Sequence, residues 1–110
     1  MLDPANLNNR CEKCTLYIKS IYEPICFYPQ ELIVSYNLDN KDFITFTIEC
    51  NERDDGVIIG RQGKTIQAIR LFTHAFSKTH LEGNPCIVQI KDHRNSRYNP
   101  FLTSKRIPNI

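Results

Sequence analysis

The sequence predicts a single α+β domain with elements in the order α–β–β–α–α–β. Two observations carry this: apolar residues recur every three or four positions in some segments, and they alternate in others. A chain of 110 residues can form one modest core. A short turn makes the first two strands antiparallel, and a helical crossover makes the third parallel to its neighbour. We therefore expect a three-stranded mixed sheet covered by helices on one face.

The first predicted helix is defined by apolar residues with a helical period. Leu7 extends this face backward, and Asp3 before Pro4 is a start signal. Pro24 predicts a kink or an end. The face consists of Cys11, Cys14, Ile18, Ile21, Tyr22 and Ile25.

Three segments have a β pattern. Residues 31–37 and 42–50 alternate between apolar and polar positions, and LDNK at 38–41 is a turn signal between them. CIVQIK at 86–91 predicts the third strand. The expected inward positions are Leu32, Val34, Tyr36, Ile44, Phe46, Ile48 and Cys50.

A second helical pattern follows the motif GRQG at 60–63. A short apolar run at 57–59 precedes the motif, and Gly83-Asn84-Pro85 ends the helix. Its buried stripe is Ile66, Ile69, Phe72 and Phe76. Another side carries Arg70, His74 and Lys78, which we interpret as a solvated face rather than a binding surface.

The stretch VIIGRQGKT at 57–65 suggests contact with phosphate. A nucleotide-hydrolysing loop of the form G-x-x-x-x-G-K-T needs a glycine at position 58, which is Ile58. Two residues between the glycines cannot wrap a triphosphate, and no later acidic strand end offers a magnesium ligand. The spacing excludes that reading, and no constellation of side chains supports catalysis.

A G-x-x-G loop between two helices suits a nucleic-acid backbone instead. The first glycine ends a short helix, and the second allows close approach as the next helix begins with its N–H groups free. Arg61 and Lys64 add positive charge, and Gln62 adds hydrogen bonds. We expect Ile58, Ile59 and Ile66 to form one apolar wall of a groove for unpaired bases.

Residues 58–69, IIGRQGKTIQAI, resemble the signature of the KH domain, and the element order resembles its type II, prokaryotic form. Within that group the chain is similar to the small stand-alone bacterial KhpA family. Residues 21–34 share that family's proline pattern, and Asp54 and Gly56 match an Asp and a Gly before its loop. The resemblance covers about residues 15–92. It leaves 1–14 as an N-terminal extension of the first helix and 93–110 as a basic, flexible tail.

The resemblance implies binding of about four unpaired RNA nucleotides, without a cofactor or metal. Carried over by position, the clamp is Gly60, Arg61, Gln62 and Gly63, with Lys64 beside it. It also implies a cytoplasmic RNA chaperone or post-transcriptional regulator that pairs with itself or with a larger KH-containing protein. Asp55 and Val57 depart from the pattern, because the family has an apolar and a basic residue there.

Several alternatives stay open. The fold could serve as a protein-interaction or ribosome-associated module without RNA affinity. The CEKC motif at 11–14 suggests zinc or redox chemistry, but no second pair exists, and we expect packing on the helix face. Five cysteines in an odd, scattered pattern indicate a reducing compartment, and no apolar run is long enough for a membrane span. Asp54-Asp55 is expected to cap the helix before the loop, and the tail's cations either contact phosphate or stay unbound.

Overall fold

In the computed structural model of the chain, the structure describes residues 3–91. The predicted element order is confirmed. The predicted tail, 93–110, lies outside the described residues. The helices and strands are α1 (Pro4–Tyr22), β1 (Ile33–Asn37), β2 (Ile44–Glu49), α2 (Asp55–Ile59), α3 (Lys64–His80) and β3 (Cys86–Ile90).

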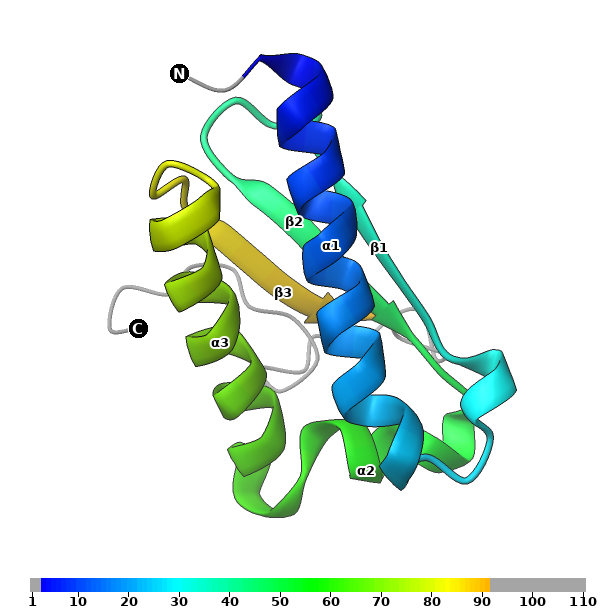
Figure 1. Ribbon diagram of the computed structural model, residues 1–110. Helices are drawn as coiled ribbons and strands as arrows, with labels where there is room; N and C mark the ends of the chain where they lie inside the picture. The colour runs from blue at the N-terminus through cyan, green and yellow to red at the C-terminus, as the bar shows by residue number, and fades with distance from the viewer. Residues whose placement is uncertain (1–2, 92–110) are drawn as a thin grey trace.

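The sheet has the predicted mixed topology, with β2 in the centre (Figure 1). β1 runs antiparallel to β2, and β3 runs parallel to it. In the middle of the sheet, Phe46 stands opposite Tyr36 on one side and Val88 on the other. This register brings the start of β1 and the ends of β2 and β3 together at the end of the sheet that is nearest α2 (Figure 1).

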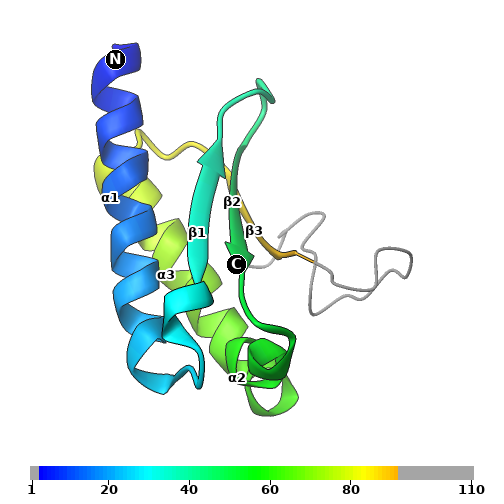
Figure 2. The same cartoon turned by 90° about the vertical axis from the view of Figure 1, so that its right-hand side faces the viewer.

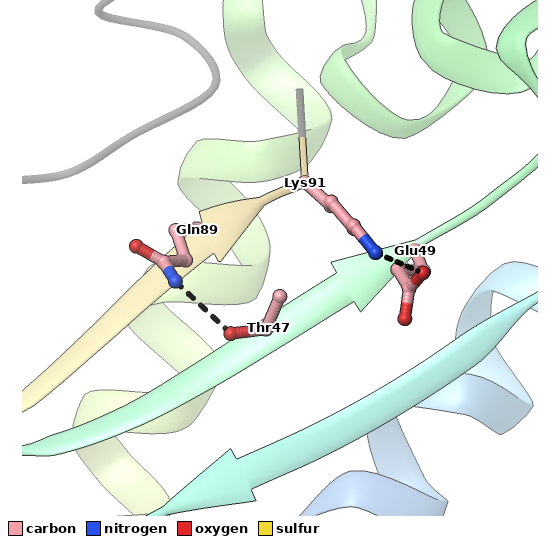
Figure 3. Close-up of polar contacts among 4 residues, drawn as sticks. All are labelled: Thr47, Glu49, Gln89 and Lys91. Carbon is pink, nitrogen blue, oxygen red and sulfur yellow. Dashed lines mark hydrogen bonds and ion pairs between the residues drawn. The ribbon is translucent and has the colours of Figure 1, made fainter. Parts of the chain in front are cut away.

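The long helices α1 and α3 cover one face of the sheet, as Figure 2 shows. Every second residue of β2 is buried beneath them, and the two helices contribute seven of the sixteen buried hydrophobic residues of the described core. The opposite face carries mainly polar side chains: Gln89 donates to Thr47 at 3.1 Å, and Lys91 pairs with Glu49 at 3.0 Å (Figure 3). The prediction of a sheet covered on one face is therefore confirmed.

The first helix begins and ends as its signals predict. The Asp3 carboxylate accepts a hydrogen bond from the Asn6 amide at 2.8 Å, with Pro4 in the first turn. Cys11 and Cys14 are fully buried, which confirms their packing role. The prediction was wrong for Ile21 and Ile25, which are 43% and 49% exposed. Ile21 lies at the margin of the buried stripe, and Ile25 follows the end of the helix in a short 3₁₀ turn.

The connection between β1 and β2 is longer than the predicted four-residue turn. It spans residues 38–43, because polar side chains hold its backbone in two successive turns. Asn37 Oδ1 accepts from the Asp39 amide and Asn40 Oδ1 from the Asp42 amide, both at 2.7 Å. The second strand therefore starts only at Ile44, and its first partner pair with β1 is Thr45 with Asn37.

Candidate nucleic-acid interface

The segment before the loop is fixed by a buried carboxylate. Asp54 is 0% exposed and accepts hydrogen bonds from the backbone amides of Phe27 and Tyr28, at 2.8 and 3.0 Å. The prediction that it caps α2 was wrong, since its side chain makes no capping bond to that helix. Two amides of the turn after α1 use both oxygens instead. The start of α2 is thereby tied to the end of α1.

The end of α2 is held by a hydrogen bond from a tyrosine of α1. The Tyr22 hydroxyl, at the last turn of α1, donates to the Ile58 carbonyl at 2.8 Å, and the contact is buried. Burial raises the pKa of this hydroxyl and keeps it a donor. This contact at the end of α2 and the Asp54 contacts at its start together hold the helix against α1 and the turn that follows α1. The loop that follows therefore starts from a rigid position.

The three isoleucines that were expected to line a groove differ in their exposure. Ile58 and Ile66 are 0% exposed, so the expectation of a base-contacting surface is corrected for both. The helical period turns them into the core, where they support the loop from beneath. Ile59 is half-buried and keeps some apolar surface beside the loop, as does Val57.

The loop backbone departs sharply from helical geometry on both sides of Arg61. Gly60 ends α2 at φ 80° and ψ 169°, and Gly63 begins α3 at φ 74° and ψ 13°. Gln62 between them is also in the left-handed region, at φ 55°. The Gly63 amide donates to the Gly60 carbonyl at 3.0 Å and closes the turn. Both glycines of GRQG are thus demanded by backbone conformation.

Close packing adds a second requirement at Gly60. A β-carbon placed there would lie 2.7 Å from the Thr65 backbone nitrogen and would also overlap the Thr65 side chain. The loop therefore folds back tightly against the first turn of α3.

The outward side of the loop carries the predicted polar groups. Arg61, Gln62 and Lys64 are exposed, and Gly63 is buried beneath them. No side chain in the described part of the chain caps the N-terminus of α3, and its first turn holds no acidic residue. The Lys64 amide donates to the Arg61 carbonyl within the loop. The positive end of the helix dipole therefore accompanies two cations at one exposed corner. This arrangement is suited to an anion such as a phosphodiester.

Asp55, the acidic residue that departs from the family pattern, contacts the residue that follows β2. The Cys50 thiol donates to an Asp55 carboxylate oxygen at 3.3 Å, and the side chain is half-buried. Burial, with this hydrogen bond, raises the pKa of the Cys50 thiol. Asp55 is therefore engaged with the buried residue that follows β2, which limits its reach toward the exposed loop.

One cation on α3 belongs to the interior, contrary to the solvated face that we expected. Arg70 is 4% exposed, and its guanidinium donates to the Val88 carbonyl of β3 at 3.3 Å, while its Nε has no hydrogen-bond partner among residues 3–91. Burial lowers the pKa of this arginine. A signal existed in the sequence, because positions 66, 70, 73 and 77 form one helical row. Ile66, Thr73 and Ser77 in that row are buried too.

Two negative findings concern residues 3–91 only. No three histidine, cysteine, aspartate or glutamate side chains in this range cluster as a metal site would require. None of its helices has the length and apolar character needed to cross a membrane.

Comparison with known proteins agrees with this geometry. The family model for the KH domain of KhpA and KhpB matches residues 16–90, well over half of the chain. The chain belongs to this KH domain family. The match contains α2, the GRQG loop and α3, and it confirms the resemblance on which the sequence interpretation rests. Nucleic-acid binding is the activity class that this membership indicates. No curated protein and no solved structure matches the chain significantly.

Proposed function

We propose that the protein binds single-stranded RNA by clamping its backbone at residues 60–64. The loop geometry is the observation that carries the proposal. Left-handed conformations at positions 60, 62 and 63 turn Arg61 and Gln62 outward beside the uncapped start of α3. Backbone amides, a helix dipole and two cations then serve the same phosphates.

Unpaired RNA fits this corner better than a duplex. The loop is only four residues long, and the neighbouring apolar surface of Val57 and Ile59 is small and half-buried. A strand whose bases are splayed out can place its phosphates at the loop and a base against this surface. Binding of this kind requires no covalent change in the RNA. It suits a cytoplasmic RNA chaperone or post-transcriptional regulator that holds its targets in a single-stranded form.

The test reverses the charge of the loop. In the variant Arg61→Asp with Gln62→Asp the two exposed side chains repel phosphate while the glycines stay in place. Each lost charge-assisted contact is worth about 1.5–3 kcal/mol, so affinity should fall at least about ten-fold. Fluorescence anisotropy with a short labelled RNA measures this, and cross-linking to cellular RNA measures it in vivo.

A matched control separates local from global charge effects. Gln30→Asp with Lys41→Asp makes the same change in formal charge at two exposed positions on the β1 side of the domain. It should bind like the parent. Unchanged RNA recovery by a folded loop variant would contradict the clamp.

A second candidate function is a protein-interaction module, and the exposed apolar residues of α1 favour it. Leu16 is 60% exposed and Tyr17 is 52% exposed, and the Tyr17 ring contacts Phe72 and Phe76 of α3 at centroid distances of 6.3 and 6.0 Å. This face would suit pairing with a second copy or with a larger KH-containing protein. Sedimentation of the purified parent without RNA tests self-pairing. A protein that pairs but binds no RNA would make this the primary function.

A further inference from the structure

Charge is strongly segregated along the chain. Residues 56–81 hold four basic residues and no acidic one, for a formal charge of +4. Residues 1–55 together with 82–92 hold six basic and twelve acidic residues, for −6. This segment runs from α2 through the loop to the end of α3, and its cations lie in the loop and in α3. Such a local excess attracts polyanions even though the chain as a whole is only slightly basic.

An exposed stripe of α3 presents two of these four cations, Lys64 and Lys78, whereas Arg61 belongs to the loop and Arg70 is buried. The members of the stripe recur every three or four residues and therefore lie above one another along the helix. All of them are exposed, and Leu71 among them is 57% exposed. The α3 stripe consists of Lys64, Gln67, Leu71, His74 and Lys78.

The neighbours of the α3 stripe leave it open. On one flank, Phe72 and Phe76 turn toward Tyr17 of α1, and on the other Arg70 reaches β3. The stripe lies between these flanks on the solvent side of the helix. Within residues 3–91, neither Lys64 nor Lys78 takes part in an ion pair. The charges of these two lysines are therefore available to a ligand.

The α3 stripe also continues directly from the loop. Lys64 belongs to both, and the helix then runs away from the loop along the side of the domain (Figure 1). From Lys64 to Lys78 the axis rises about 21 Å. That length accommodates at most about six nucleotides at the ~3.4 Å spacing of a stacked strand.

We propose that the α3 stripe is an extension of the RNA-binding surface. The strand that enters at the loop continues along the stripe, so the footprint exceeds four nucleotides. His74 and Lys78 contact its phosphates, and the exposed side chain of Leu71 between them packs against a base. The inference rests on the proposed function, since the loop fixes where the strand enters.

The test varies RNA length and stripe charge independently. Anisotropy titrations use uridine oligomers of four and ten nucleotides against the parent and the variant His74→Glu with Lys78→Glu. The parent should bind the longer RNA at least about ten-fold more tightly, with a salt slope steeper by about 0.7 for each added phosphate contact. The variant should bind the four-nucleotide RNA like the parent and lose most of the gain from length.

Gln30→Glu with Lys41→Glu is the control, because it changes the formal charge equally at exposed sites away from α3. It should retain the length dependence, and thermal melting checks that all variants are folded. The inference is overturned if the parent gains nothing from length, or if the stripe variant keeps the full gain. It is equally overturned if that variant weakens both RNAs alike. A parent that binds neither RNA contradicts the proposed function itself.

Discussion

Two glycines four residues apart should respond in opposite ways to the same substitution. At Gly60, alanine must adopt φ 80° and ψ 169°, a region that is essentially restricted to glycine and costs about 1–3 kcal/mol. Its β-carbon would also lie 2.7 Å from the Thr65 nitrogen. The reduced entropy of the unfolded chain offsets only about 0.4–1 kcal/mol. Gly60→Ala should therefore lower the free energy of unfolding by about 2 kcal/mol.

Gly56 is the control for this substitution. It lies within α2, has no positive φ, and an added β-carbon meets nothing within 4 Å. Gly56→Ala should raise the free energy of unfolding by up to about 1 kcal/mol, since alanine favours the helix.

Urea unfolding followed by circular dichroism measures both changes. In a domain of this size the loss at Gly60 corresponds to a fall in Tm of roughly 8–16 °C. RNA affinity should fall with it, because the turn that directs Arg61 outward is distorted. If Gly60→Ala and Gly56→Ala have equal stability, the backbone argument for the loop is refuted.

Two further predictions concern the interior. Asp54→Ala leaves the amides of Phe27 and Tyr28 without their acceptor, and should lower the free energy of unfolding by about 2–4 kcal/mol in urea titrations; a loss below about 0.5 kcal/mol would contradict the anchoring role. Burial raises the pKa of Cys11 to about 11 and of Cys14 to about 12, from near 9. Because the folded state favours the neutral thiols, their contribution is complete below pH 9. It is lost between pH 9 and about 11 for Cys11 and between pH 9 and about 12 for Cys14, by at most about 1.4 kcal/mol per pH unit for each thiol. Urea unfolding across this range should show a shallower slope for Cys11→Ala with Cys14→Ala, and equal slopes would refute the prediction.

Much of the fold is local in origin, and for that reason it could be predicted. The start of α1 depends on Asp3 and Pro4, which are adjacent, and the faces of β2 depend on alternation within six residues. The helix break at GRQG follows from glycines whose conformational freedom is a property of the residue itself. Neighbouring positions in the sequence determine each of these features.

What could not be predicted depends on partners that are distant in sequence. Asp54 looked like a helix cap because capping is the common local use of an aspartate, whereas its acceptor oxygens serve amides 26 and 27 residues away. Ile58 and Ile66 looked like groove residues because they flank the loop. Only the packing of α2 and α3 in the folded domain shows that both side chains are buried in the core.

The rigidity of the loop and its charge have separate origins, and this separation bears on function. Rigidity comes from the buried contacts of Asp54 and Tyr22, which tie α2 to the end of α1. Charge comes from the exposed side chains of Arg61 in the loop and of Lys64 and Lys78 in α3, a helix that carries no acidic residue. A substitution in the supporting contacts should therefore reduce stability and RNA affinity together. A substitution in the α3 stripe should change affinity, salt dependence and footprint while stability stays the same, because no part of the core relies on those side chains.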